Sequence, residues 1–492
     1  MSNGLPIRDF RRGRITSIAD SLIPENSVSD SLNVNFDTKI GSGVVRSGTT
    51  KLGGTVSAGS TPLGLTTFST TDLSTNLVVG VVSGATNASF RYYNGSWNTA
   101  GTQPNSGTWS NTKKNRFANL GGRIFVANGA QAMNSTTNGN VWGTTNCLPN
   151  TTTTHLVGLV FRQKNRLLAA GDTLFPSRVW FSSVISPAAA TTLTWADGNL
   201  GGDFIDINPD DGDYVTAFAE TADQFLVFKS NAFYRLNVIS KTVDTENIFD
   251  VGAVSQEAVT RCQGVAYFFS GKDIRRTAGG FPEQISRLGV QDYIDAISQS
   301  SWANVALGAD DWNVYASIGN ITLNTGKDNQ ATYKNVVLKF STRDEAWSVH
   351  STGDQYRFFT KYTTSADGKT LIGSETSGNV QTLNKGFTDN GRPIFYFLET
   401  QDLEFGGLQD VKEISNNIVA FTDNGQNSRL KISTDGKTLK EIPIDLTERV
   451  SVGRNVNERG NYFKFRWEGE STGDAPVFEG LFIPSPTNSG IN

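Results

Sequence analysis

The sequence predicts an all-β protein built around an irregular β-propeller of about six to eight blades. A short apolar phrase, as in LVVGVV and FLVFKS, returns about every 40 to 60 residues. Most copies precede a turn and a second strand rich in aromatic residues, as in FRYYNGSW. Small repeated sheets bury their faces by packing around a common axis, which also hides most strand edges. The copies begin at Leu77, Arg123, Arg166, Phe225, Val265, Asn313 and Leu371.

The composition agrees with this fold class. The chain has 492 residues, more than one hydrophobic core usually serves, so we expect two or three domains. Hydrophobic residues make up 37%, including 30 Phe, 9 Trp and 12 Tyr, which excludes global disorder. The 50 glycines indicate many turns between short strands.

The opening segment, residues 1–55, reads as an N-terminal arm. Pro24 fixes the local chain, and residues 27–30 could begin a single helical turn. The alternation in LNVNFD predicts a strand, and Gly41, Gly43 and Gly48 mark turns. We expect this arm to pack across the propeller or to close its ring.

Residues 56–390 contain the repeats and form the predicted propeller. Dipeptides such as Asn94-Gly95 and Asp367-Gly368 favour tight hairpins, because they tolerate positive φ. One helix is predicted near residues 288–299. It places one apolar face at i, i+3, i+4 and i+7, made of Val290, Tyr293, Ile294 and Ile297.

After Gly391 the pattern changes to longer strands with alternating polarity, such as IFYFLETQDLEF and NYFKFRWEGE. Five or more half-buried strands predict a C-terminal β-sandwich or barrel domain over residues 391–492. The tail from Pro484 to Asn492 has little to bury, so we expect it to be mobile or held by a neighbour.

The net charge, the short apolar runs and the two cysteines make several classes of protein less suitable for this sequence. The net charge is −4 without a basic stripe, which disfavours tight nucleic-acid binding but permits transient passage of a polyanion. No apolar run approaches the length of about 20 residues that spans a bilayer, and polar ITSIADS stands where a signal peptide needs an apolar core. Cys147 and Cys262 lie in different repeats, so we expect assembly in a reducing cytoplasm.

The sequence offers little material for catalysis, so we predict that the protein is not an enzyme. Its two histidines, His155 and His350, lie in different repeats, which disfavours a paired metal site or a Ser-His-Asp triad. No phosphate-binding loop, dinucleotide fingerprint or nucleophile elbow occurs in a strand-to-helix setting.

The densest cluster of acidic residues lies in the segment GGDFIDINPDDGDY, and Asp203 is the first aspartate in it. Such oxygen ligands could hold Ca²⁺, although the EF-hand spacing is absent. The alternative is a solvated turn shaped by Pro209 and Gly212. No other cofactor is expected. The calcium candidates are Asp206, Asp210, Asp211 and Asp213.

Two further groups of residues, the tryptophans and the arginines of the arm, can each be interpreted as functional or as structural. Four tryptophans could stack sugars or bases, but in a repeat protein they more often pack between blades. The arginines from Arg8 to Arg14 could meet DNA or an acidic partner surface, or could belong to a solvated arm. The tryptophans are Trp195, Trp302, Trp312 and Trp347.

Several segments resemble one family of bacteriophage proteins. The opening segment is LIPENSVSDSLNVNFDTKIGSGVVRSGT, where a proline-led stretch precedes N-V and R-x-G-T. The central segments are GDFIDINPDDGDYVTAFAETADQFLVFKSNAFYRL and GVAYFFSGKDIRRTAGGFPEQISRLGVQDYID, and the last is YFKFRWEGESTGDAPVFEGLFIP. Over about three-quarters of the chain, they resemble the tail nozzle (tail tubular protein B) and the head-to-tail stabilisation or plug proteins of short-tailed phages.

The resemblance implies a structural virion protein of the phage tail, assembled in the bacterial host cytoplasm. It implies a homo-oligomeric ring, commonly a hexamer, that contacts adjacent tail or adaptor proteins and fibres. Double-stranded DNA would pass transiently through its channel, and a gate would need a segment whose packing can switch. The candidate gate segments are the polar stretches Gly101 to Gly107 and Gly319 to Gln330.

Two other functions remain open. A receptor-binding or fibre-anchoring tail protein would expose aromatic residues on its C-terminal domain. A propeller glycan hydrolase would need two carboxylates about 5 to 10 Å apart, and the aspartates are too scattered to nominate a pair.

Overall fold

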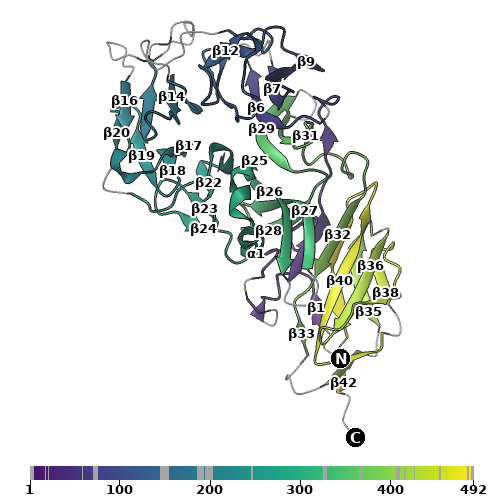
Figure 1. Ribbon diagram of the computed structural model, residues 1–492. Coiled ribbons are helices and arrows are strands. Elements are labelled where there is room, and N and C mark those ends of the chain that lie inside the picture. The colour runs from purple at the N-terminus through teal and green to yellow at the C-terminus, as the bar shows by residue number, and fades with distance from the viewer. Residues whose placement is uncertain are drawn as a thin grey trace.

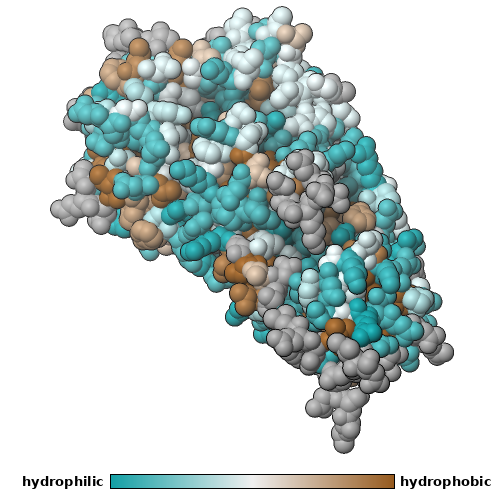
Figure 2. Space-filling model, turned by 60° about the horizontal axis from the view of Figure 1, so that its bottom comes forward, coloured by the Kyte–Doolittle hydropathy of each residue, from teal (hydrophilic) through white to brown (hydrophobic). Residues whose placement is uncertain are grey.

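The molecule is elongated, with a propeller at its broad end and a β-sandwich at its narrow end (Figure 1). On the face in Figure 2, hydrophilic residues cover most of the surface, and hydrophobic residues gather in several small groups. The computed structural model describes residues 5–16, 18–19, 22–57, 59–69, 76–143, 155–184, 193, 195, 203–244, 248–324, 330–364, 368–405, 411–414, 417–425, 427–453, 456–484 and 487–488.

Seven small antiparallel sheets in the described ranges form the blades of the propeller. Blades 1 to 4 consist of β6 Pro62–Ser69, β7 Asn76–Ser83, β8 Ala88–Tyr93 and β9 Trp97–Thr99; β10 Arg116–Leu120, β11 Arg123–Ala127 and β12 Asn134–Thr136; β13 Leu159–Gln163, β14 Arg166–Ala170, β15 Arg178–Phe181 and β16 Asp203–Asp206; β17 Val215–Glu220, β18 Phe225–Lys229, β19 Phe233–Asn237 and β20 Thr242–Val243.

The remaining three blades complete the ring. They consist of β21 Val259–Cys262, β22 Val265–Phe269, β23 Ile274–Thr277 and β24 Glu283–Gln284; β25 Ala306–Ala309, β26 Asn313–Asn324, β27 Gln330–Ser341 and β28 Trp347–Ser351; and β29 Tyr356–Thr364, β30 Gly368–Glu375, β31 Val380–Thr382 and β5 Thr50–Lys51.

The first strand of each blade faces the propeller axis, and these inner strands pack side by side around the ring. The last blade meets the first where Thr67 Oγ1 of β6 donates to the Lys361 carbonyl of β29 at 2.9 Å. The fold class predicted from the sequence, an all-β propeller with six to eight blades and a sandwich, is confirmed, with seven blades in the described residues.

Each apolar phrase in the sequence is the second strand of a blade, from β7 through β30. The second strand of a blade pairs with another strand on each edge, and each of its two faces packs against a neighbouring blade. In β18, all five residues from Phe225 to Lys229 are therefore buried. This double burial explains why these strands read as continuous apolar runs without alternation.

The predicted helix is shorter in the structure and lies between blades 5 and 6. It comprises α1 Gln291–Asp295, followed by the 3₁₀ turn η5 Gln299–Asn304. All four residues of its predicted apolar face, from Val290 to Ile297, are buried in the core of blades 5 and 6. The other 3₁₀ turns are η2 Pro104–Gly107, η3 Pro209–Asp211 and η4 Gln256–Ala258.

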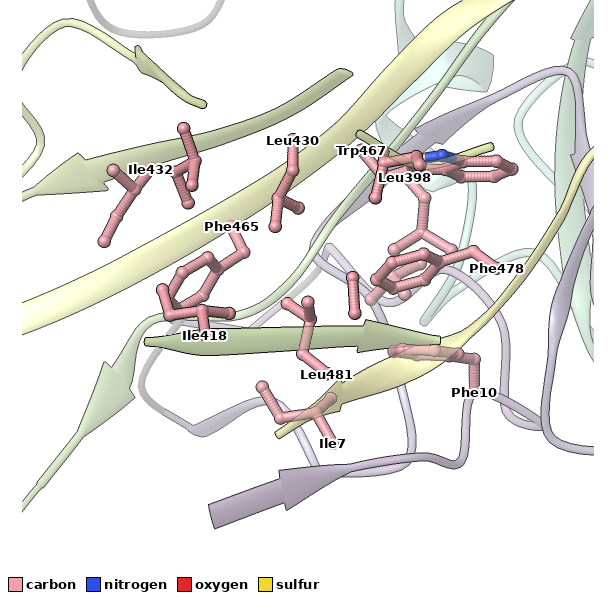
Figure 3. Packing of buried hydrophobic residues seen from close by; sticks show 14 of the residues in the cluster. Ile7, Phe10, Leu398, Ile418, Leu430, Ile432, Phe465, Trp467, Phe478 and Leu481 are labelled. Carbon is pink, nitrogen blue, oxygen red and sulfur yellow. The ribbon is translucent and has the colours of Figure 1, made fainter. Parts of the chain in front are cut away.

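The β-sandwich has two six-stranded sheets and a small three-stranded one in the described residues. Its core is a continuous apolar cluster between the sheets, in which Trp467 stacks on Phe478 (Figure 3). The sheets are β1 Leu5–Ile7, β3 Val34–Asn35, β4 Gly43–Val45, β35 Ile418–Asp423, β38 Val450–Gly453 and β41 Val477–Ile483; β2 Asp30–Leu32, β32 Ile394–Glu399, β33 Leu403–Glu404, β36 Ser428–Thr434, β37 Lys440–Ile442 and β40 Tyr462–Ser471; and β34 Lys412–Ile414, β39 Glu458–Gly460 and β42 Thr487–Asn488.

The N-terminal arm divides between the two domains. Strands β1 to β4 lie in the sandwich, where Leu5 pairs with Ile483 and Asp30 pairs with Glu399. Only β5 enters the propeller, as the outer strand of blade 7 beside β31. The arm joins the sandwich because its apolar side chains, such as Phe10 and Phe36, complete that domain's core.

The chain crosses between the domains twice, and the two crossings run side by side. Gly48 N–H donates to the Gly386 carbonyl at 2.7 Å, and Thr49 N–H donates to the Thr388 carbonyl at 3.1 Å. A Cβ atom on Gly48 would lie 2.0 Å from the Thr388 carbonyl oxygen, so only glycine allows this approach. Arg46 Nη1 donates to Asp389 Oδ1 at 2.9 Å, which ties one crossing to the other.

Candidate functional site at the propeller axis

A cavity of about 220 Å³ lies on the propeller axis. Residues from six of the seven blades line it, and most of them are apolar side chains of the inner strands. Apart from Thr66 of blade 1, its polar lining lies at or just before the start of two inner strands that face each other across the ring. The lining residues are Leu65, Thr66, Asn115, Arg116, Phe117, Val160, Phe161, Gln256, Glu257, Val259, Leu307, Phe358 and Phe359.

A buried ion-pair cluster sits at this end of the axis. Glu257 precedes blade 5, and its side chain is only 5% exposed. Arg116, which begins the inner strand of blade 2, donates to it from Nε at 2.8 Å and from Nη2 at 3.1 Å. Lys114 Nζ donates to Glu257 Oε2 at 3.1 Å and also donates to the Ala303 carbonyl beside blade 6. Glu257 therefore joins blades on opposite sides of the axis.

The electrostatics of the cluster follow from this geometry. Although burial disfavours its charged form, the cations Arg116 and Lys114 lower the pKa of Glu257 to about 2. Burial lowers the pKa of Lys114, and the positive charges of Arg116 and Arg357 lower it further against the opposing effect of Glu257. A carboxylate with such a low pKa stays ionised at neutral pH, so Glu257 is poorly suited to general acid–base catalysis.

The ion pairs also close the bore of the propeller at this end. Arg116 and Glu257 meet at hydrogen-bonding distance across the axis. Next to them, the side chain of Gln256 accepts from Phe218 N–H at 2.8 Å and donates to the Phe218 carbonyl at 3.0 Å, which connects blade 4. Duplex DNA is much wider than any space between side chains in such contact, so the bore of one propeller is not a DNA channel.

The structure places the calcium candidates along one turn between blades 3 and 4. Asp206 forms a bidentate pair with Arg178 at 2.7 Å, and Asp211 accepts from the buried Lys229 at 2.7 Å. Asp213 accepts from Asn231 N–H at 2.9 Å, while Asp210 is exposed. In the described part of the chain, no three metal-binding side chains come together. These contacts are those of a hydrogen-bonded turn, and calcium binding stays a prediction.

The two histidines lie far apart and are both buried. His155 Nδ1 is 2.6 Å from Asp172 Oδ2, beside the ring of Trp180. His350 Nε2 is 2.9 Å from Asn35 Oδ1. Burial, helped by nearby Arg46 and Lys339, holds the pKa of His350 well below its ordinary value, so it is neutral at physiological pH.

The tryptophans mostly pack between strands. Trp195 and Trp347 are buried in blade cores, and Trp302 packs partly buried against the core of blades 5 and 6. Trp312 is 43% exposed, and the Arg343 guanidinium lies 3.7 Å from its ring centroid. Only Trp312 of these four is placed where it could stack on a ligand from solvent.

The arginines of the N-terminal arm have different surroundings. Arg14 is buried and paired with Asp30 at 3.0 Å and with Asp292 of α1 at 2.9 Å, so it holds the arm against the propeller. Arg11 pairs with the neighbouring Asp9, and Arg12 is exposed. The sequence does not distinguish these roles, because the partner Asp292 is distant along the chain.

Parts of the two predicted gate segments lie in defined secondary structure. Residues 319–324 extend β26, and residue 330 begins its partner β27, so most of this stretch is a long hairpin whose residues 325–329 lie outside the described residues. Gly101 to Gly107 includes η2, and Gly101 N–H donates to Asn140 Oδ1 at 2.7 Å. Neither stretch lines the axial cavity.

Cys262 is a buried free thiol whose pKa burial raises to about 11, while Cys147 lies outside the described residues. A thiol with so high a pKa is a poor nucleophile at neutral pH. In the described ranges, no helix has the length and apolar character needed to cross a membrane.

Comparisons with known proteins concern the fold. No family model matches the sequence, and no curated protein sequence matches it. Similar solved structures include BBS1N in complex with ARL6DN, with a TM-score of 0.42, 12% identity and coverage of 69% of this chain and 98% of that chain. YCF48 bound to D1 peptide has a TM-score of 0.41 and 8% identity, covering 67% and 93%. The WD40 β-propeller domain of Doa1 has a TM-score of 0.37 and 9% identity, covering 68% and 96%. At such identities, only the fold is compared.

Proposed function

We propose that the protein is a structural subunit of a phage tail, a nozzle or plug that continues the DNA channel, retains the genome and permits its ejection. The observation that carries the proposal is the resemblance of the opening, central and closing segments to that family. The proposed partners are further copies of this chain in a ring of about six, adjacent tail or adaptor proteins, fibres and DNA in transit. The proposed location is the virion tail, after assembly in the host cytoplasm.

The joint between the domains supports a mechanical role. Besides the pairs of Arg14 and Arg46, Lys339 of blade 6 donates to Asp37 of the arm at 2.7 Å. These pairs are largely buried, and burial shields them from screening by salt. A subunit whose two domains are held in one orientation can transmit load without bending, which a tail component needs.

The closed bore constrains how such a ring would be built. Because side chains cross the axis of the propeller, a DNA channel would have to lie between subunits arranged around a larger axis. The chain's net charge of −4 agrees with a channel wall that does not hold DNA tightly.

We also propose that the protein is not an enzyme, although propellers host enzymes as well as binding proteins. The axial site offers an ionised carboxylate locked by two cations. In the described residues, neither histidine lies beside a serine or cysteine nucleophile that it could activate.

Electron microscopy of the purified protein, combined with mass spectrometry of purified virions, tests the proposal. We expect closed rings of several copies and the protein among the virion components. A protein that stays monomeric at high concentration and is absent from particles would refute the proposal.

A receptor-binding or fibre-anchoring role is the second candidate, and surface residues of the sandwich favour it. Phe395 is 43% exposed, and Val450 and Val452 project from β38, which lies at the edge of its sheet. Exposed apolar residues on an edge strand suit attachment of another chain. An antibody against residues 391–492 that blocks adsorption without preventing ring assembly would favour this role over the first.

A further inference from the structure

We propose that the propeller axis binds a small oxyanion of the phosphate type, held by Lys114 and Arg357 beside the Glu257 cluster. The proposal concerns a ligand of one subunit, and it holds whether or not the protein forms a tail ring.

The first observation is a charge imbalance in a confined place. Lys114, Arg116 and Arg357 are three cations, and Glu257 is the one carboxylate that pairs with any of them in the described residues. Both oxygens of Glu257 are already used, by Arg116 and Lys114. The three cations therefore outnumber the carboxylate that pairs with them, in a partly buried position where charge is weakly screened.

The second observation is one buried guanidinium nitrogen without a partner. Arg357 Nε is buried and has no hydrogen-bond partner. The nearby Asp354 does not pair with it, because that carboxylate accepts from Thr376 Oγ1 and from Ser377 N–H at 2.8 Å. A buried donor of this kind is unfavourable unless an acceptor satisfies it.

The third observation concerns Lys114, which has one donor left. An ammonium group has three N–H donors, and the two acceptors of Lys114 are Glu257 and the Ala303 carbonyl. Arg357 is close enough to Lys114 for its charge to contribute to the lowered pKa of that lysine. An anion in contact with both cations would relieve their mutual repulsion and be stabilised by both.

The axial cavity gives an anion a way in. Its polar lining consists of Thr66, Asn115, Arg116, Gln256 and Glu257, whose negative charge is already paired with Arg116 and Lys114. Phe358, which neighbours Arg357 in the chain, is one of its aromatic walls. The Lys114 Nζ atom lies 5.9 Å from the centroid of the Phe358 ring, so this cation is next to the cavity wall. Aromatic walls lower the local dielectric constant and strengthen the attraction between an anion and these cations.

Titration of the full chain with inorganic phosphate against chloride at equal ionic strength tests the proposal. Isothermal calorimetry measures affinity, and thermal unfolding measures stabilisation. We expect saturable binding of phosphate and a rise in Tm that chloride does not produce. Arg357→Gln should weaken phosphate binding at least about tenfold, as expected for loss of one charged hydrogen bond.

Two further variants separate binding from structural damage. Arg91→Gln is the matched control, because Arg91 is another partly buried arginine with an unpartnered Nε, in the third strand of blade 1. It should bind phosphate like the wild type. Glu257→Gln should bind phosphate more tightly, because it removes the competing carboxylate while Lys114 and Arg116 remain.

Three results would overturn the proposal. They are equal effects of phosphate and chloride on the wild type, wild-type affinity in a folded Arg357→Gln variant, or an equal loss of affinity in Arg91→Gln. If Glu257→Gln does not fold, the comparison of Arg357→Gln with Arg91→Gln decides alone.

Discussion

The joint between the domains buries its cations and the axis of the propeller partly buries them, but only at the joint does each cation have a carboxylate of its own. At the joint, Arg14, Arg46 and Lys339 face four carboxylates, which are Asp30, Asp292, Asp389 and Asp37. At the axis, Lys114 and Arg116 share Glu257, and the buried Nε of the nearby Arg357 has no hydrogen-bond partner in the described residues.

The difference separates a structural role from a binding role. A buried charge whose partners are all present holds its surroundings in one arrangement, and removing a partner is strongly destabilising. A buried excess of charge is unfavourable in the isolated subunit and becomes favourable when a ligand of opposite sign arrives. We therefore interpret the joint as a permanent connection between the domains and the axis as a site that can bind a ligand.

The largest effect is expected from breaking the joint at Arg46. Arg46→Met leaves Asp389 buried without its cation, so the free energy of unfolding should fall by about 3–5 kcal/mol. Urea denaturation measures this. The double variant Arg46→Met/Asp389→Leu should recover part of the loss, and Arg429→Met, which breaks an exposed pair with Glu441, should change stability by less than about 0.5 kcal/mol. An equal loss in both single variants would contradict a special role for the joint.

The titration of Glu257 tests the axis. Its pKa is lowered to about 2 in the folded protein, so the folded state gains stability when the group is ionised. That contribution is complete above the unfolded pKa of about 4.5 and is lost as the pH falls toward 2. Over this range it amounts to about 3 kcal/mol. Denaturation at several pH values should show a flatter acid limb for Glu257→Gln than for the wild type, and an unchanged slope would contradict the ion-pair account.

Glu375 of blade 7 should behave in the opposite way, because it is buried and forms no ion pair within the described residues. Burial, assisted by the nearby Asp354, raises its pKa to about 7 against the effects of Gln381, Ser377 and Lys51. The folded state therefore binds this proton more tightly than the unfolded state does. The contribution is present below the unfolded pKa of about 4.5 and is lost as the pH rises through 7.

Glu375→Gln should consequently stabilise the protein by about 3 kcal/mol at pH 8 and have little effect at pH 4. Tm measured at both pH values checks this. Gln keeps an acceptor for the Gln381 amide, whose Nε2 lies 2.9 Å from Glu375 Oε2. A variant that is destabilised equally at both pH values would show that the carboxylate is needed for packing instead.

The smallest effect is expected from a change at the joint that involves no charge. In Gly48→Ala the new methyl group would collide with the Thr388 carbonyl oxygen, so the two crossings must separate slightly. We expect a loss of at least about 1 kcal/mol in the free energy of unfolding. Gly54→Ala is the control, because nothing lies within 4 Å of its added Cβ. Equal stability of the two variants would mean that the crossings can separate freely.

The propeller could be predicted because its signal is local. A second strand that is buried on both faces must be apolar along its whole length, so β7, β18 and β30 are visible as phrases in the sequence. The helix face at Val290 and Ile294 is visible for a different local reason, because its apolar residues recur at helical spacing.

The rest of the fold and the axial site could not be predicted, because their contacts are distant in sequence. Nothing near Leu5 indicates that its strand pairs with one at Ile483. Lys114, Glu257 and Arg357 belong to three different blades and form no motif. Their shared feature, a charged residue at or just before the start of an inner strand, becomes meaningful only when the blades close into a ring.

The pairing of β1 with β41 has a mechanical consequence. These strands come from opposite ends of the chain, run antiparallel and place Leu5 beside Ile483. A force that pulls the two ends apart would break the hydrogen bonds of this pair one after another, which needs less force than shearing them together. The sandwich would yield first under tension, and the seven-bladed ring would stay unloaded until the terminal strands had peeled away.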